Sequence, residues 1–225
     1  MAASRVSKEA SVPASPLRGR RLRRAFYRRH ATELAKALIG KVLVHRVGDR
    51  AFAARIVETE AYVGEHDLAC HAAAGRTART EPLYGAPGIA YVYFIYGMYW
   101  CFNAVTRAEN EPSAVLVRAI EPVEGMALMR RRRAKARRDV DLTNGPGKLC
   151  LALGIGREHN GARLDRPPIL VRGGESVADA DVVVTPRIGI TQSADWPLRY
   201  FIKDNAFVSK TPASFPRTIF RASCS

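Results

Sequence analysis

Glu58 and Glu60 stand two positions apart in the largely apolar segment 56–62, and their types and spacing could support hydrolytic chemistry. The alternation of a β-strand places both carboxylates and the ring of Tyr62 on one face, with the carboxylates about 7 Å apart. Acidic residues are poor strand formers, so two in an apolar strand indicate either a cleft or ion pairs with the many arginines. A carboxylate in a cleft can deprotonate a water molecule for hydrolysis.

A pair of acids at this spacing also fits an inverting sugar hydrolase, which needs room for water between its carboxyl groups. The formal net charge of +15 and the presence of only two tryptophans argue against that class. The charge favours a polyanionic partner such as nucleic acid. A ribosomal-type structural protein would carry a similar charge, so charge alone does not establish an activity.

Residues 91–103, with the sequence YVYFIYGMYWCFN, are the second informative segment. Four of the eight tyrosines lie within nine residues here, on both sides of Gly97. Aromatic and β-branched residues favour strands, and glycine permits the positive φ of a chain reversal, so the segment predicts a β-hairpin. Aromatic side chains at an exposed tip can wedge between stacked bases or hold a single base.

The elements that must position these residues are short. The sequence pattern predicts helices over 32–40, 122–138 and 148–153, and a long loop over 64–88. It predicts strands over 41–47, 51–63, 114–120, 169–171, 182–185, 187–190 and 198–203. Strands outnumber helices and most connections are short. The predicted fold class is therefore α+β, a single domain with a largely antiparallel curved β-sheet, flanking helices and a protruding β-hairpin.

The 225 residues divide into three predicted parts: a basic tail over 1–24, one catalytic domain over 25–210 and a C-terminal tail over 211–225. The first tail contains a single acid, Glu9, and its composition predicts disorder. A phosphate-binding arm, an organelle transit peptide and a solvated tail all fit it. No apolar run approaches the roughly 18 residues of a membrane span. The four cysteines show no zinc-binding spacing, so no metal is expected. Reduced thiols are expected from the usual state of cysteines in cytosolic proteins, with a structural disulfide as the alternative.

Four motifs then occur in order: VETEAY at 57–62, the hairpin at 91–103, LVRAIEP at 116–122 and GPGKLC at 145–150. Together they resemble the alkyladenine (3-methyladenine) DNA glycosylase family, whose fold is distinct from that of the helix-hairpin-helix glycosylases. The resemblance covers about residues 30–210. It implies that a damaged purine is flipped out of duplex DNA and that its N-glycosidic bond is hydrolysed, leaving an abasic site.

The resemblance also implies the catalytic residues. Glu60 is expected to act as the general base that deprotonates a water molecule aimed at C1′ of the deoxyribose. Arg118 matches the residue that helps to position this water, and a charged side chain in an apolar strand needs a partner such as Glu60. Glu58 is expected to have a structural role, such as an ion pair.

By the same resemblance, Tyr62, His71 and Tyr93 line the pocket that receives the flipped base. Alkylation at N3 or N7 makes a purine cationic, and electron-rich ring faces attract cations. Asn103 matches the residue that discourages normal guanine through its exocyclic amine. Tyr96, beside the glycine of the tip, matches the wedge that occupies the space left in the duplex.

A dense basic run is expected to contact DNA phosphates. Its members are Arg130, Arg131, Arg132, Arg133, Lys135, Arg137 and Arg138. We assign backbone contacts to Arg130, Arg131 and Arg133, and to Lys148 in the GPGKLC motif. Such contacts set affinity and salt dependence but do not select the lesion. A solvated helix end is the alternative for the run.

The sequence thus predicts a monofunctional hydrolase without a metal or organic cofactor, since no lysine is placed as an amine nucleophile for a lyase step. Its predicted partner is double-stranded DNA with damaged purines, bound by a monomer and away from membranes. Expected locations are the nucleoid-associated cytoplasm of a bacterium, or the nucleus or an organelle of a eukaryote. A catalytically inactive nucleic-acid-binding relative and an O-glycoside hydrolase remain open as alternatives.

Overall fold

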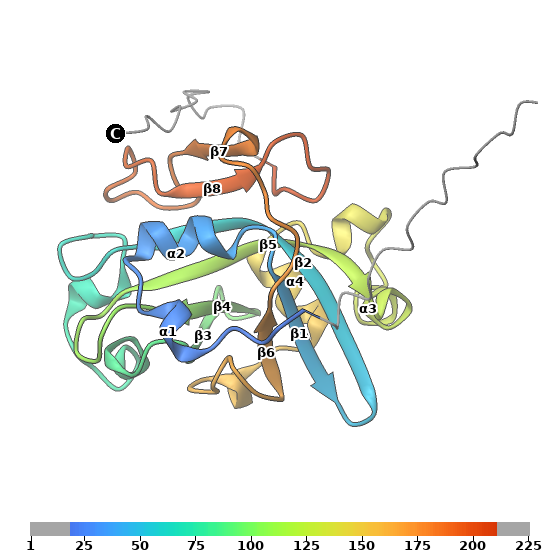
Figure 1. The fold of residues 1–225 in the computed structure, drawn as a ribbon, viewed down its shortest axis with the longest axis horizontal. Coiled ribbons are helices and arrows are strands. Elements are labelled where there is room, and N and C mark those ends of the chain that lie inside the picture. Colours follow the sequence, from blue (N-terminus) through green and yellow to red (C-terminus); the bar gives the residue numbers. More distant parts are fainter. Residues whose placement is uncertain (1–18, 211–225) are drawn as a thin grey trace, which may run out of the picture.

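The computed structural model describes residues 19–210, which form an α+β domain around an antiparallel sheet (Figure 1). Its strands are β1 (Val42–Val47), β2 (Arg50–Tyr62), β3 (Ala90–Ile95), β4 (Tyr99–Val105), β5 (Ala114–Glu124), β6 (Ile169–Arg172), β7 (Val182–Thr185) and β8 (Arg199–Ile202). The order across the sheet is β3-β4-β5-β2-β1-β6, and β8 pairs with both β2 and β7. The predicted fold class is confirmed.

The central strand β2 changes neighbours along its length. Residues 50–55 pair with β1, whereas residues 58–60 pair with β8, and β5 follows β2 on its other side. The pairing with β5 is irregular on both sides of Glu58, as at a β-bulge. Glu58 and Glu60 are both fully buried. Because strands flank this part of β2 on both edges, its side chains are held in fixed directions.

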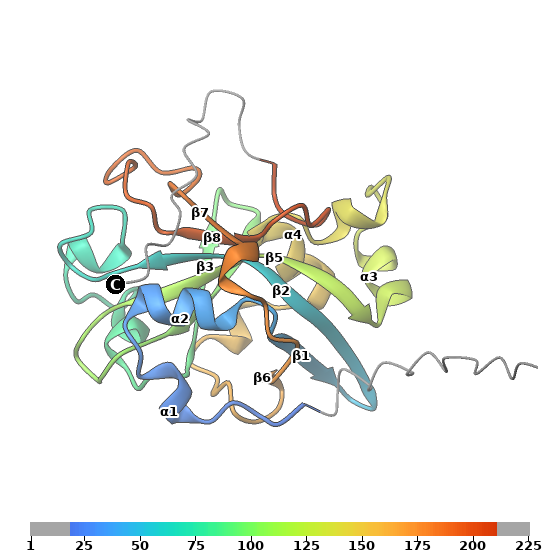
Figure 2. The same ribbon diagram turned by 45° about the horizontal axis from the view of Figure 1, so that its top comes forward.

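Four α-helices lie in the described residues: α1 (Arg24–Tyr27), α2 (Ala31–Leu38), α3 (Met126–Arg132) and α4 (Pro146–Leu153). Helix α2 crosses one face of the sheet near β2 (Figure 2), and its Leu34, Ala35 and Leu38 are fully buried. The Thr59 hydroxyl donates to the carbonyl of Ala35 over 3.0 Å, which fixes α2 against β2. Five short 3-10 helices complete the description, over 71–74, 81–84, 139–142, 157–159 and 179–181.

The predicted helix over 122–138 is wrong at both ends, because α3 covers only Met126–Arg132. Strand β5 continues through Pro122 to Glu124, and α3 begins only after Gly125, whose φ is +83°. Strand β4 pairs with β5 only as far as Leu116, so Pro122 lies where β2 is its one neighbour. Proline is tolerated at such an edge, because no ladder bond from its missing N–H is needed there.

The predicted strand over 187–190 is also wrong, because this segment is a loop. Gly189 has a φ of +78°, and the backbone N–H of Ile188 donates to the side chain of Glu60 instead of to a neighbouring strand. The predicted long loop over 64–88 is present and contains the first two 3-10 helices.

The tyrosine-rich segment is the predicted hairpin. Strands β3 and β4 pair from Ala90–Ala104 to Ile95–Tyr99, and both Tyr96 (φ 55°) and Gly97 (φ 66°) have positive φ at the turn. The left-handed backbone conformation is uncommon and strained for a tyrosine. The turn therefore directs the Tyr96 side chain outwards, and Tyr96 is 76% exposed.

Both predicted tails fall largely outside the described residues, which exclude 1–18 and 211–225. Residues 19–22 run beside β6, where the Leu22 N–H donates to the Val171 carbonyl over 2.9 Å and Arg21 forms a bridge with Arg172. Within residues 19–210, no helix is long and apolar enough to span a membrane.

Candidate active site

A cavity of about 360 Å³ lies between the hairpin, the end of β2, the start of α4 and the loop 188–190. Its wall also includes parts of β5 and of the segment 69–71. Residues from distant parts of the chain therefore meet at this cavity. Six of the predicted site residues line it: Tyr62, His71, Tyr93, Tyr96, Asn103 and Arg118.

Glu60 lies directly behind the cavity wall. Its side chain is fully buried, yet Oε2 accepts a hydrogen bond from the Tyr62 hydroxyl over 3.0 Å and lies 3.1 Å from Arg118 Nη1. Its Oε1 accepts from the backbone N–H of Ile188 over 2.8 Å. All three partners line the cavity, so one layer of residues separates the carboxylate from the open space.

Arg118 joins Glu60 to Glu58. Its Nε donates to Glu58 Oε1 over 3.0 Å, while Nη1 lies 3.1 Å from Glu60 Oε2. Burial alone would lower the pKa of Arg118, but the negative charges of Glu60 and Glu58 outweigh burial and raise it. Arg118 therefore remains cationic at the edge of the cavity.

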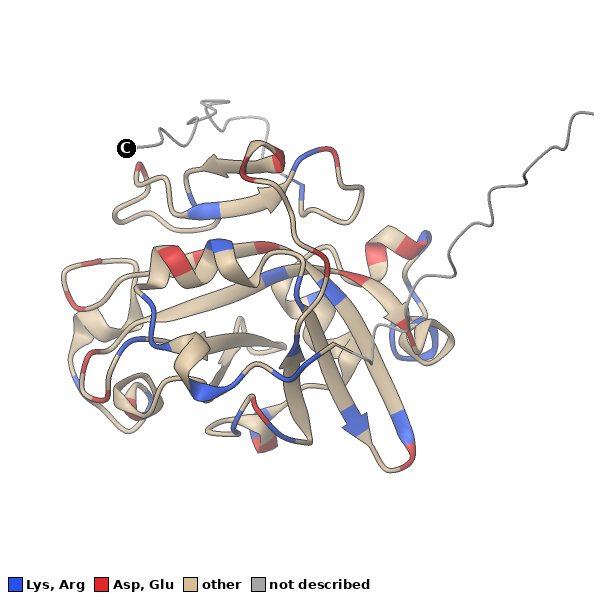
Figure 3. Cartoon of the chain, viewed as in Figure 1, with Lys and Arg blue, Asp and Glu red and all other residues tan. Residues whose placement is uncertain are grey.

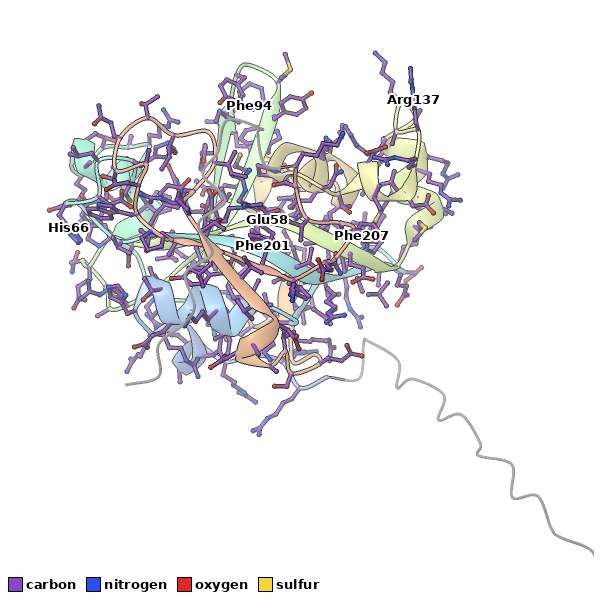
Figure 4. All side chains as sticks on the ribbon, turned by 90° about the horizontal axis from the view of Figure 1, so that it is seen from above. Glu58, His66, Phe94, Arg137, Phe201 and Phe207 are labelled. Carbon is purple, nitrogen blue, oxygen red and sulfur yellow. The ribbon has the colours of Figure 1, made fainter. Side chains whose placement is uncertain are left out.

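Besides its contact with Arg118, the Glu58 carboxylate accepts hydrogen bonds from Arg199 and Ser209. Its Oε1 accepts from Arg199 Nε over 2.6 Å and from the Ser209 hydroxyl over 2.8 Å, and its Oε2 accepts from the Ser209 N–H over 2.7 Å. Figure 4 places Glu58 in the middle of the molecule. These contacts agree with the structural role predicted for Glu58.

The aromatic wall of the cavity is a cluster of rings without charge at neutral pH. The centroids of His71 and Tyr93 are 4.5 Å apart, and those of Tyr91 and Tyr93 are 5.3 Å apart. His71 Nδ1 lies 2.8 Å from the Tyr91 hydroxyl. Burial, aided by the charge of Arg79, lowers the pKa of His71 to about 4, and burial raises the pKa of Tyr91 to about 12.

Asn103 lies on β4, with only 3% of its surface exposed. Its Nδ2 donates to the Tyr91 carbonyl over 3.0 Å, which fixes the side chain across the base of the hairpin. At the other end of the hairpin, Tyr96 borders the cavity and is strongly exposed. The hairpin thus carries a buried amide and an exposed ring at opposite ends of one wall.

The predicted phosphate-binding residues lie outside the cavity lining. Arg130 forms a bidentate contact with Asp139 at 2.7 Å, and Arg133 donates to the Asp141 carbonyl over 3.1 Å. Lys148 donates to Asn144 Oδ1 over 2.7 Å.

Arg131 is exposed on α3, where Figure 3 shows a concentration of basic residues. Figure 4 shows Phe94 of the hairpin and Arg137 beyond α3 projecting on the same side of the molecule. The hairpin and the basic run therefore share one side of the molecule.

The sequence reasoning missed three parts of this site. Tyr91 was placed in the hairpin but given no role, although it supports His71. The loop 188–190 was predicted as a strand, although it closes one side of the cavity. The buried ion pair of Asp67 and Arg187 had no detectable signal, because its partners are 120 residues apart.

Comparisons with known proteins show the family to which the chain belongs. The model of the methylpurine-DNA glycosylase family matches residues 25–206, and the chain belongs to this family of hydrolytic DNA glycosylases. A protein of Myxococcus xanthus named "Putative 3-methyladenine DNA glycosylase" is 48% identical over 191 residues, covering 84% of this chain and 93% of that protein. A Clostridium botulinum (strain Langeland) protein of the same name is 46% identical over 200 residues, covering 84% and 98% respectively.

Proposed function

We propose that this enzyme removes alkylated purines such as 3-methyladenine from duplex DNA, with Glu60 activating the attacking water. The observation that carries the proposal is the position of the Glu60 carboxylate, which is bonded to three groups of the cavity wall. A carboxylate at this depth can accept a proton from a water molecule that enters between those groups.

The aromatic wall supports the choice of substrate. A purine alkylated at N3 or N7 carries a positive charge, and the faces of tyrosine rings attract cations by about 0.5–2 kcal/mol. His71 is neutral at pH 7, so it does not repel this charge. The buried Asn103 gives the pocket a polar group that would discriminate against a normal guanine, because guanine carries an exocyclic amine.

The reaction is a hydrolysis in which the bond between C1′ and the purine nitrogen breaks. The purine leaves with the bonding electrons, which neutralise its positive charge. Water adds to C1′ as the sugar gains oxocarbenium character, and Glu60 accepts the proton from that water. The negative charge of Glu60 also stabilises the developing cation, and Arg118 orients the carboxylate.

Base flipping is proposed to depend on the hairpin. The target base cannot react while it is stacked in the duplex, and extrusion costs a few kcal/mol. Tyr96 is exposed at the tip and borders the cavity, so its ring can replace the extruded base in the stack. Arg130, Arg131, Arg133 and Lys148 are proposed to contact the phosphates, and Arg130 and Arg131 are both exposed.

We further propose that the enzyme acts as a monomer and stops at the abasic site. Lysine is missing from the cavity lining found in residues 19–210, so no side-chain amine is positioned there to attack C1′. Among residues 19–210, the sugar-hydrolase alternative lacks a second carboxylate poised at the cavity, because Glu58 is occupied by Arg118, Arg199 and Ser209.

The test is incubation of the full chain with methylated duplex DNA, followed by chromatography of the released bases. Release of 3-methyladenine with intact phosphodiester bonds is expected. Binding to the duplex without any release would identify the inactive relative, and hydrolysis of an O-glycoside without base release would identify the sugar hydrolase.

A further inference from the structure

Asp67 and Arg187 form a fully buried, bidentate ion pair. Arg187 Nη1 lies 2.6 Å from Asp67 Oδ2, and Nη2 lies 2.8 Å from Oδ1. The carboxylate also accepts from the backbone N–H groups of Val63 and Ala69, each over 3.2 Å. These contacts hold both charges in one orientation.

The pair stands behind the ring of Tyr62. The guanidinium carbon of Arg187 lies 4.7 Å from the centroid of that ring. Tyr62 lines the cavity, whereas Arg187 is fully buried and does not. The ring therefore separates the ion pair from the space in which a base would stack.

Arg187 stays charged in this position. Burial alone would lower its pKa, but the hydrogen bonds and the negative charge of Asp67 raise it. A lone guanidinium on one face of a ring draws electron density towards itself and opposes a second cation on the other face. The carboxylate of Asp67 cancels this opposing charge.

We propose that the Asp67–Arg187 pair determines how strongly the pocket prefers a cationic base over a neutral base of the same shape. The inference rests on the proposed function, in which the flipped base stacks on Tyr62. A balanced pair leaves the Tyr62 face attractive to a cation and keeps the ring in place. The pair is thus a specificity determinant that touches the ring rather than the substrate.

A purely structural role makes a different prediction. The pair also connects the loop that contains Asp67 to the loop that contains Arg187. Arg187 Nη1 donates to the carbonyl of Ala61 in β2 over 3.1 Å, and Nη2 donates to the Ser193 carbonyl over 3.3 Å. If fastening these loops were its only role, substitutions would weaken the binding of cationic and neutral bases equally. A change in the ratio of the two affinities separates the alternatives.

The experiment measures dissociation constants of the full chain for two duplexes. One contains 7-methylguanine on a 2′-fluoroarabinose, which is cationic and resists hydrolysis. The other contains 7-deaza-7-methylguanine, which has the same shape and no charge. The ratio of the two constants is the preference for a cation, and it does not depend on the fraction of folded protein.

Asp67→Asn leaves the guanidinium uncompensated and should lower this preference on the order of tenfold, as expected for a charge acting through one ring in a partly screened interior. Arg187→Gln leaves the carboxylate and should raise the preference. The double substitution removes both charges and should return the preference for a cation to within about twofold of the parent value. Asp165→Asn, which breaks the surface pair with Arg163, is the matched control and should leave it unchanged.

Removing one partner of a buried ion pair is strongly destabilising, so circular dichroism should accompany each titration. If Asp67→Asn does not fold, Arg187→Gln is compared with the double substitution, because only the former keeps a carboxylate behind the ring. Equal preferences across the folded variants would overturn the inference while leaving the glycosylase proposal intact. Failure of the parent to bind either lesion over undamaged DNA would instead contradict the proposed function.

Discussion

The hydroxyl of Tyr62 donates a hydrogen bond to Oε2 of Glu60 over 3.0 Å. The two residues are next-but-one neighbours on β2, so strand alternation brings both side chains to one face. Tyr62 lines the cavity and Glu60 lies behind it. One side chain therefore connects the surface that would bind a base to the carboxylate that would activate water.

Glu60→Gln should abolish base release while leaving lesion binding nearly intact. The amide keeps the shape of the carboxylate but cannot accept the proton of the attacking water, and a general base contributes about 10²–10⁴-fold. Single-turnover release from methylated duplex DNA and fluorescence anisotropy measure the two properties. Glu33→Gln, at an exposed position on α2, is the control. Release at the parental rate by Glu60→Gln would rule out the proposed mechanism.

Tyr62→Phe should slow base release by about tenfold with little change in lesion affinity. The ring and its stacking surface remain, but Glu60 loses one charge-assisted hydrogen bond, an interaction of about 1.5–3 kcal/mol. The maximal single-turnover rate and the dissociation constant are measured on the same duplex. A loss confined to affinity would show that the hydroxyl serves binding and not the carboxylate.

Tyr96→Ser should weaken lesion binding or slow excision, because the vacated position in the stack is no longer filled. Stacking of an aromatic side chain on a base is worth about 1–3 kcal/mol, which predicts a change of roughly five- to 150-fold. Val123→Ser removes another exposed apolar side chain, on β5, and serves as the control. If affinity and excision were both unchanged in Tyr96→Ser, the wedge would be refuted.

His71 should make the protein less stable in acid. Its pKa is lowered to about 4, below the ordinary value of 6.5, so the unfolded chain binds this proton more readily than the folded protein. Stability should therefore fall as the pH decreases from about 6.5 to 4. One pKa unit corresponds to about 1.4 kcal/mol, and partial exposure reduces the total to about 2 kcal/mol.

Denaturant unfolding at pH 7 and pH 4.5 measures this effect. The free energy of unfolding should fall less between the two pH values in His71→Gln than in the parent protein. Burial also lowers the pKa of His45, so some acid sensitivity should persist in that variant. An identical loss in parent and variant would show that His71 does not contribute.

Affinity for undamaged DNA should fall steeply with salt, because phosphate contacts release counterions. Arg131→Gln should reduce the slope of log K against log salt by about one. Arg50→Gln, in the β1–β2 hairpin, changes the net charge equally and should have little effect. Equal slopes for the parent and Arg131→Gln would remove Arg131 from the phosphate-binding surface.

Local sequence was sufficient for the parts of the fold that depend on neighbours in the chain. Strand alternation placed Glu58 and Glu60 on one face, where both contact Arg118. Gly97 correctly marked the reversal of the hairpin. The predicted helix over 122–138 failed at its start because pairing with β2 keeps residues 122–124 extended despite their local pattern.

The sequence by itself determined the α+β class, the tyrosine hairpin and the types of residue available for chemistry, because alternation and turn preferences act over a few residues. Only the tertiary structure decided that Ile188 bonds to Glu60 and that Asp67 neutralises Arg187 behind Tyr62. These partners are more than 100 residues apart in the chain. Local preferences carry no information about such contacts, which form when the sheet brings the two segments together and burial requires each charge to find a partner.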